Sequence, residues 1–202
     1  MGITIVYFFI FGACMSRKLI IYDNIFNESG LEAVKQLIRK NEHRDLMEYP
    51  FAKKGSILID NTIQQLFASL LGAPVVILNG GGAVQQVNIG SNRAFAYSTA
   101  DWFAIISIDD IYSDNESLTL LADKENSNRL FVDEMTRELN GRYASIALVD
   151  RDINEGFTKG ACIPFKKNQL LLIEANLWHS IELKDNSNLM SFYIKRDDYV
   201  QG

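Results

Sequence analysis

The sequence predicts an α+β protein in which two helices near the amino end precede an antiparallel β-sandwich or jelly roll. Two observations predict this fold class. Two well-marked amphipathic helical patterns occur before residue 75, and most of the remaining chain consists of short apolar segments separated by turn-forming residues. The sequence contains no internal repeat, low-complexity tract or linker that would divide it into several globular parts.

The composition is that of a chain able to bury a substantial core. The 202 residues carry a net charge of −5, with 48% hydrophobic and 22% charged residues. Lysine and arginine are scattered along this acidic chain, which excludes a general nucleic-acid binder. Cys14 and Cys162 are too few for a disulfide framework or a zinc site, and they are compatible with the reducing cytoplasm, where we expect the protein.

The first fourteen residues differ from the rest. Residues 2–14 form an apolar run that is shorter than the ~20 residues of a membrane-spanning helix. No basic residue precedes the run, which is atypical of a signal peptide. We therefore interpret residues 1–14 as an apolar N-terminal extension, residues 15–202 as a single jelly-roll domain, and expect no stable membrane anchor.

Both early helices have recognisable ends. The first is predicted over residues 28–41, where apolar side chains recur on one stripe and Asn27 or Ser29 can cap the amino end. The second begins with a cap at Asp60 or Asn61, and a glycine and a proline stop it. Two amphipathic helices so early in the chain are expected to pack on one face of the following sheet.

The predicted strands begin with a short run before the first helix and dominate after the second. Runs of strand length cover residues 18–22, 56–59, 75–78, 83–89, 95–97, 102–108, 118–122 and 142–149, with three more between 160 and 195. The glycine-rich residues 79–82 predict a hairpin rather than a phosphate loop, because no helix follows them. Residues 130–139 are predicted as a short helix and residues 150–159 as a charged loop.

The stretch from residue 160 to 195 holds the best candidate site residue, His179, one of only two histidines. It follows the turn-like pair 175–176 and enters a strand, so its ring can point into the mouth of a small barrel, where a metal or substrate could bind. The alternative is a packed histidine beside Trp178 without chemistry. His43 lies in a charged run after the first helix and is predicted to be solvated.

The order of elements over roughly residues 18–196 resembles the double-stranded β-helix of iron(II)/2-oxoglutarate-dependent dioxygenases. The specific part is the motif Asn168-x-Leu-x-Leu-x-Glu-x-x-Leu-x-His179-Ser, followed by a final strand. The resemblance implies a jelly-roll core, Fe(II) and 2-oxoglutarate as cofactors, and His179 as the distal iron ligand.

The metal motif departs from the family pattern. The family supplies its other two ligands as His-x-Asp, and this chain reads Tyr-Ser-Thr-Ala-Asp-Trp over residues 97–102. By the resemblance, Ser98 stands at the missing histidine position and Asp101 is the carboxylate shifted in register. His179 and Asp101 are therefore the candidate metal ligands, with one imidazole where the usual site has two.

The cosubstrate position departs as well. The family carries a basic residue about ten positions after the distal histidine, and here that position falls near Asn188. Lys195 comes later and Arg93 comes from mid-chain, so both remain speculative anion contacts. An unpaired carboxylate in a buried pocket costs several kcal/mol, and loss of a nitrogen donor weakens iron binding.

Four functions remain open on these residues. The first is a binding protein or pseudo-enzyme for a small molecule or a protein or peptide, without the usual iron and cosubstrate ligands. The second is an active non-haem iron hydroxylase with an atypical set of His179, Asp101 and Glu174 or Glu182. The third is a metal-free, cupin-like acid–base enzyme in which Asp101 orients His179. The fourth is a structural jelly roll with tryptophan in its core.

Overall fold

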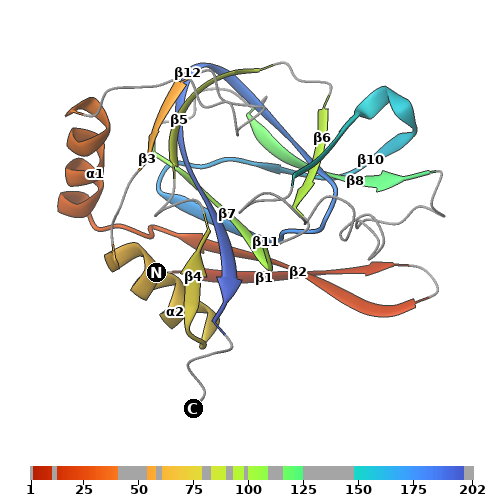
Figure 1. Ribbon diagram of the computed structural model, residues 1–202, viewed down its shortest axis with the longest axis horizontal. Helices are drawn as coiled ribbons and strands as arrows, with labels where there is room; N and C mark the ends of the chain where they lie inside the picture. Colours follow the sequence, from red (N-terminus) through yellow and green to blue (C-terminus); the bar gives the residue numbers. More distant parts are fainter. Residues whose placement is uncertain are drawn as a thin grey trace.

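The chain folds into two antiparallel β-sheets that face each other, with two helices on the outside of the larger sheet (Figure 1). The computed structural model describes residues 2–10, 13–40, 54–57, 61–78, 83–89, 93–97, 100–108, 116–124 and 148–197. Because the two sheets share one long strand, β12 (His179–Arg196), they form a single rolled structure. The predicted α+β jelly roll with two helices packed on one sheet is confirmed.

The larger sheet, here called the major sheet, follows the order β1-β2-β11-β7-β12-β5-β3. Its strands are β1 (Gly2–Ile10), β2 (Ala13–Asp23), β11 (Gln169–Glu174), β7 (Trp102–Ser107), the second half of β12, β5 (Ala83–Ile89) and β3 (Lys54–Ile57). The short β4 (Val75–Ile77) pairs with the end of β12.

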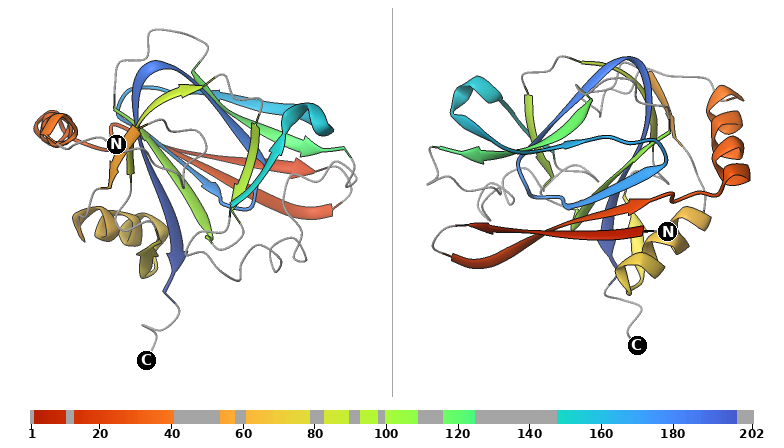
Figure 2. Two further views of the ribbon diagram at one scale, coloured as in Figure 1. Left: turned by 45° about the horizontal axis from the view of Figure 1, so that its top comes forward. Right: turned by 180° about the vertical axis from the view of Figure 1, so that it is seen from behind.

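The minor sheet is built around the first half of β12, which lies between β6 (Arg93–Tyr97) and β8 (Ser117–Asp123). β9 (Leu148–Asp152) extends the sheet beyond β6, and β10 (Phe157–Pro164) extends it beyond β8. A one-turn 3-10 helix, Ile153–Glu155, joins β9 to β10. Two views from other directions show the minor sheet covering one side of the major sheet (Figure 2).

Side chains alternate between two hydrophobic clusters on the faces of the major sheet. In β11, Leu171 and Ile173 belong to the inner cluster between the sheets, and Leu170 and Leu172 belong to the outer cluster beneath the helices. The strand is buried on both faces, which explains why its sequence is a continuous apolar run without visible alternation.

Both helices pack on the outer cluster. Ile63 and Phe67 of α2 (Asn61–Leu71) are buried there, and Leu31 of α1 (Glu28–Lys40) packs against it. The Asn27 side chain accepts a hydrogen bond from Gly30 N–H at 2.8 Å and so caps α1, as predicted. Gly72 has a φ of 65°, the left-handed conformation that ends a helix at little cost in glycine.

The apolar run at the amino end continues the major sheet. β1 pairs antiparallel with β2, and residues 19–23 of β2 pair with β11. Residues 13 and 14, placed in the extension by the sequence interpretation, are the first two residues of β2. The division into residues 1–14 and 15–202 stays a prediction.

Two local predictions are wrong. β4 and β5 do not form a hairpin, because both pair antiparallel with β12 and therefore run in the same direction. The predicted loop over residues 150–159 contains the end of β9 and the start of β10, whose exposed polar positions are tolerated at an outer strand. β12 itself is continuous, and its pairing with β5 shifts register between Leu183 and Ser187.

The predicted helix over residues 130–139 and most of the strand predicted over residues 142–149 lie outside the described residues. Within the part of the chain that is described, neither helix has the length and apolar character needed to cross a membrane.

Candidate functional site

His179 begins β12 and points between the two sheets. It alternates with Ser180 and faces the same way as Ile181, a member of the inner cluster, and its side chain is fully buried. Its backbone pairs with Phe95 of β6 on one side and Leu120 of β8 on the other. The predicted inward orientation of this ring is therefore present, but the ring is packed rather than exposed at an open mouth.

The two ring nitrogens of His179 have different surroundings. Nδ1 lies 2.8 Å from the carbonyl oxygen of Leu177, so Nδ1 carries the hydrogen and donates it. Nε2 is buried and has no hydrogen-bond partner within the described structure. Burial lowers the pKa of His179 to about 4, against the opposing effect of the Leu177 carbonyl, so the ring is neutral near pH 7.

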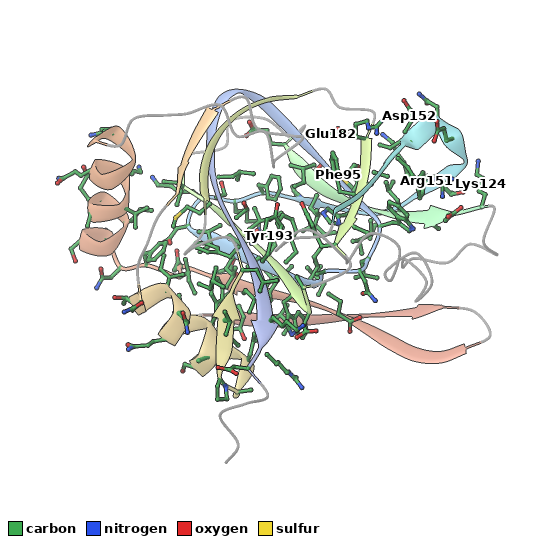
Figure 3. All side chains as sticks on the ribbon, viewed as in Figure 1. Phe95, Lys124, Arg151, Asp152, Glu182 and Tyr193 are labelled. Atoms are coloured by element: carbon green, nitrogen blue, oxygen red, sulfur yellow. The ribbon has the colours of Figure 1, made fainter. Side chains whose placement is uncertain are left out.

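Three aromatic rings pack around this imidazole, and a fourth packs against two of them. We call the five rings the aromatic cluster: Phe95, Tyr97, Phe103, His179 and Tyr193. Phe103 stacks on His179 with ring centres 5.2 Å apart and an interplanar angle of 24°. The Tyr97 ring centre lies 5.8 Å from His179, and that of Phe95 lies 6.5 Å away. Phe95 and Tyr193 lie between the sheets in Figure 3.

Tyr193 closes the cluster from the major sheet. Its hydroxyl donates to the Tyr97 hydroxyl at 3.1 Å, and the two ring centres are 4.4 Å apart. Phe103 lies nearly parallel to Tyr193, at 5.3 Å and 17°. All five side chains are at most 1% exposed, so substrate in solvent cannot reach the imidazole without movement of the cluster.

Asp101 is bound at a different place. Its carboxylate Oδ2 accepts a hydrogen bond of 2.8 Å from the backbone N–H of Arg196, at the far end of β12 from His179. Its own backbone pairs with Ile194 and Ala175. Because Nδ1 of His179 already donates to Leu177, the predicted orientation of His179 by Asp101 is not the arrangement observed. Whether either residue binds metal stays a prediction.

The other candidate carboxylates face away from the interior. Glu174 follows the alternation of Leu170 and Leu172 and so faces the outer side of the major sheet. Glu182 is on the opposite face of β12 from Ile181, and its Oε1 lies 3.5 Å from Lys159 Nζ at the surface. Neither carboxylate joins His179.

The remaining candidates are scattered. Arg93 begins β6, at the opposite end of that strand from Tyr97. Lys195 is exposed near the end of β12. Ser98 and His43 lie outside the described residues.

The two tryptophans occupy outer faces rather than the site. Trp102 belongs to the outer cluster beneath the helices. Trp178 packs on the outside of the minor sheet with Phe157, and Arg151 lies over both rings at 5.8 and 4.9 Å. Arg151, which is labelled in Figure 3, also forms an ion pair of 2.7 Å with the buried Asp123, and this pair ties β9 to β8.

These residues do not fit the iron site implied by the resemblance. Among the described residues, no group of three or more His, Cys, Asp and Glu is arranged to hold a metal. His179 retains one feature of a metal-binding histidine, since Nδ1 donates to a carbonyl and leaves the Nε2 lone pair available. Its ring neighbours, however, are Phe95, Tyr97 and Phe103, of which only Tyr97 carries a side-chain oxygen.

Comparison with solved structures establishes the fold. HygX from Streptomyces hygroscopicus, solved with nickel, 2-oxoglutarate and hygromycin B bound, superimposes with a TM-score of 0.50 over 90% of this chain and 83% of its own, at 11% identity. The fold is the double-stranded β-helix of 2-oxoglutarate/Fe(II) oxygenases. The non-haem α-ketoglutarate-dependent epimerase SnoN, from nogalamycin biosynthesis, gives a TM-score of 0.50 over 89% of this chain and 78% of its own, at 10% identity. No family model and no curated protein matches the sequence.

The sequence interpretation found His179 but missed the residues packed around it. Tyr97, Phe103 and Tyr193 each lie in a segment that was predicted as a strand or read as a final strand. Alternation along those strands places all three on the inner face, together with Phe95 and His179. Their chemistry was not recognisable beforehand because the facing of a buried strand requires knowledge of the fold.

Proposed function

We propose that this chain is a pseudo-enzyme of the oxygenase fold, which binds a small molecule or a protein or peptide without performing iron(II)/2-oxoglutarate chemistry. The observation that carries the proposal is the packing of His179 inside the aromatic cluster, with every ring at most 1% exposed. Within the described part of the chain, an interior packed in this way leaves the outer surfaces as the places where a ligand can bind.

The donor chemistry supports this proposal. Iron(II) lies low in the affinity order of divalent metals, so its sites depend on several good donors. The usual set of two imidazoles and one carboxylate would require both histidines of the chain, His43 and His179. The carboxylate nearest in sequence to the expected position, Asp101, already accepts a hydrogen bond from the backbone of Arg196.

The lining for a cosubstrate dicarboxylate is also unsuitable. The inward positions on the second half of β12 include Leu189, Ser191 and Tyr193, and all three are buried and uncharged. A carboxylate placed among them would lose its hydration without gaining a cationic partner, which costs several kcal/mol. Lys195 shares their strand parity but is exposed to solvent.

Acid–base catalysis by His179 is less well supported than binding. A general base must come within hydrogen-bond reach of the proton that it removes, and its pKa should lie near the working pH. The imidazole is fully buried, and burial holds its pKa at about 4. It would therefore be a weak base that substrate cannot contact.

The test is an anaerobic titration of the full chain with Fe(II) in the presence of 2-oxoglutarate. Oxygenases that bind both develop a weak metal-to-ligand charge-transfer absorbance, and this chain is expected to show none at millimolar cosubstrate. A known oxygenase of the same fold serves as the positive control. Appearance of the band in this chain, together with its loss in His179→Ala, would overturn the proposal.

A further inference from the structure

The outer strands of the two sheets differ in how readily a further strand can pair with them. β3 is four residues long and begins with Lys54, and β9 carries the charged residues Asp150, Arg151 and Asp152. Short length and charged side chains are the usual protection of a sheet edge against pairing with another chain. β1 has neither protection, because its nine residues include no charged residue and no proline. It is therefore better suited than β3 or β9 to accept a further strand.

β1 also belongs to an arm that lacks support. Within the described structure β1 pairs with β2 alone, so its second edge has no neighbouring strand. β2 pairs with β11 only over residues 19–23. Residues 7–10 of β1 and 13–18 of β2 consequently form a two-stranded arm that extends past β11 (Figure 1). Because a hairpin without a third strand is only marginally stable in water, the arm favours a partner that adds a strand.

The order of residues in β1 suits pairing with a second copy of the same strand. Full antiparallel overlap of two β1 strands places Val6 opposite itself, on a two-fold axis. In this register Ile5 lies opposite Tyr7 of the second copy. Thr4 likewise lies opposite Phe8. Each of these pairs combines a β-branched residue with an aromatic residue, which is a favourable cross-strand combination.

The same register gives each arm its third strand. Residues 7–10 of one copy lie opposite residues 2–5 of the other. Residues 2–6 are the part of β1 that pairs with residues 19–23 of β2, the segment joined to β11. The projecting half of each strand thus lies against the supported half of its partner. Opposite residues also differ by an even number of positions, so they face the same side and the two major sheets join with matching faces.

We propose that two copies of this chain associate through β1, in antiparallel register about Val6, so that their major sheets form one continuous sheet. The edge of a nine-residue strand is roughly 30 Å long and 10 Å thick, or about 300 Å² per copy. A standard interface buries about 800 Å² per partner, so the dimer should be weak, with a dissociation constant in the micromolar range. The inference involves neither iron nor a ligand and does not depend on the proposed function.

The first experiment follows the mass of the full-length chain by sedimentation over a dilution series. The natural chain should change from monomer to dimer between about 1 and 500 µM, the range that corresponds to a weak interface. Val6→Lys places two lysines directly opposite each other across the two-fold axis and should weaken dimerisation at least tenfold. A natural chain that stays monomeric at the highest concentration overturns the inference, as does a folded Val6→Lys chain that dimerises equally well.

Matched variants separate strand pairing from general stickiness. Val6→Glu should also weaken dimerisation, because two carboxylates then lie opposite each other. An equimolar mixture of folded Val6→Lys and Val6→Glu should form the mixed dimer at least tenfold more tightly than either variant forms its own. Val76→Lys adds the same charge at an exposed valine on β4 and should leave dimerisation unchanged. A mixture that stays monomeric, or an equal loss in Val76→Lys, overturns the assigned edge.

Cross-linking decides the case in which the charged variants fail to fold. Val6→Cys is introduced after both natural cysteines, Cys14 and Cys162, have been replaced by serine. On the two-fold axis the two Cα atoms lie about 4.5–5.5 Å apart, within the range of a disulfide. Thr4→Cys in the same background is the control, because its two copies are about 14 Å apart in this register. Oxidation should give a covalent dimer of Val6→Cys alone. Equal yields from the two variants, or no dimer from Val6→Cys, overturn the register.

Discussion

The two faces of the major sheet are equally buried but differ in chemistry. On the outer face, Ile106 and Phe192 pack with α2 in a cluster whose members are mainly aliphatic and phenylalanine side chains. On the inner face lie the neighbouring residues of the same strands, Ile105 and Tyr193. Tyr193 belongs to the aromatic cluster, which contains three rings with polar atoms. Burial alone therefore does not distinguish a mainly apolar surface from one that carries several polar ring atoms.

The difference lies in what each face must satisfy. The outer face has polar ring atoms only on Tyr22 and Trp102 among the buried members of its cluster, and the amphipathic helices cover it with apolar side chains such as Ile63 and Phe67. The inner face contains polar ring atoms that need hydrogen-bond partners, and only some of these atoms have one. The tyrosine hydroxyls pair and His179 Nδ1 reaches Leu177, but Nε2 has no partner in the described structure. Substitutions on the two faces should consequently change the stability of the protein in different ways.

The largest expected effect is on the outer face. Phe192→Ala removes a fully buried ring that contacts Phe67 of α2 edge-on, with ring centres 5.1 Å apart. The free energy of unfolding should fall by about 3–5 kcal/mol, since the void forms in a tightly packed region. Urea denaturation would measure it, with Phe192→Leu as the conservative control. A loss below ~1 kcal/mol would show that α2 is only loosely attached to the sheet.

The inner face should respond to pH, which the outer face should not. The pKa of His179 is about 4 in the folded chain and about 6.5 when unfolded, so above pH 6.5 the ring is neutral in both states. As the pH falls from 6.5 to 4, the His179 imidazole becomes protonated in the unfolded chain but stays neutral in the folded chain. Stability should then decrease by up to roughly 3 kcal/mol and level off below pH 4 as far as this group is concerned.

The measurement is the difference in unfolding free energy between the natural chain and His179→Phe across that pH range. Carboxylates that titrate in both proteins cancel in the difference. His43→Gln is the matched control, because the sequence predicts a solvated histidine at that position. A difference curve that stays flat between pH 6.5 and 4 would contradict the neutral, desolvated state of His179.

The smallest expected effect concerns Asp101, which belongs to neither cluster. Asp101→Ala removes the acceptor for the Arg196 N–H, a partly exposed hydrogen bond, and should cost about 0.5–1.5 kcal/mol. Asp101→Asn keeps an acceptor oxygen and should cost less. Thermal denaturation would measure both. If Asp101→Ala instead abolished a metal-dependent signal in the natural chain without affecting stability, Asp101 would be a ligand rather than a structural acceptor.

Local signals predicted the helices well because their ends are encoded in single residues. Asn27 caps α1 and Gly72 adopts the left-handed conformation that ends α2, and both roles follow from side-chain or backbone chemistry at one position. Strand pairing was less predictable. The Asn79-Gly80 dipeptide indicated a hairpin, but β4 and β5 both pair with the distant β12, a long-range choice that no local pattern specifies.

The position of His179 was predictable from the sequence, but the facing and the partners of the other candidate residues were not. His179 could be placed at the start of an inward-facing strand because a turn at residues 175–176 precedes it. The outward facing of Glu174 and Glu182 required the register of strands buried on both faces. The hydrogen bond between Asp101 and Arg196 joins residues 95 positions apart, which lies beyond any spacing argument.

The continuity of β12 also limits how the interior can ever be reached. The strand belongs to the minor sheet at Ile181 and to the major sheet at Phe192, with no interruption between them. The two sheets therefore cannot move apart as rigid bodies, because their separation would break backbone hydrogen bonds of the continuous strand β12. Access to the buried imidazole must instead come through local openings that leave β12 intact or through cooperative unfolding, and amide exchange along β12 should be among the slowest in the described part of the molecule.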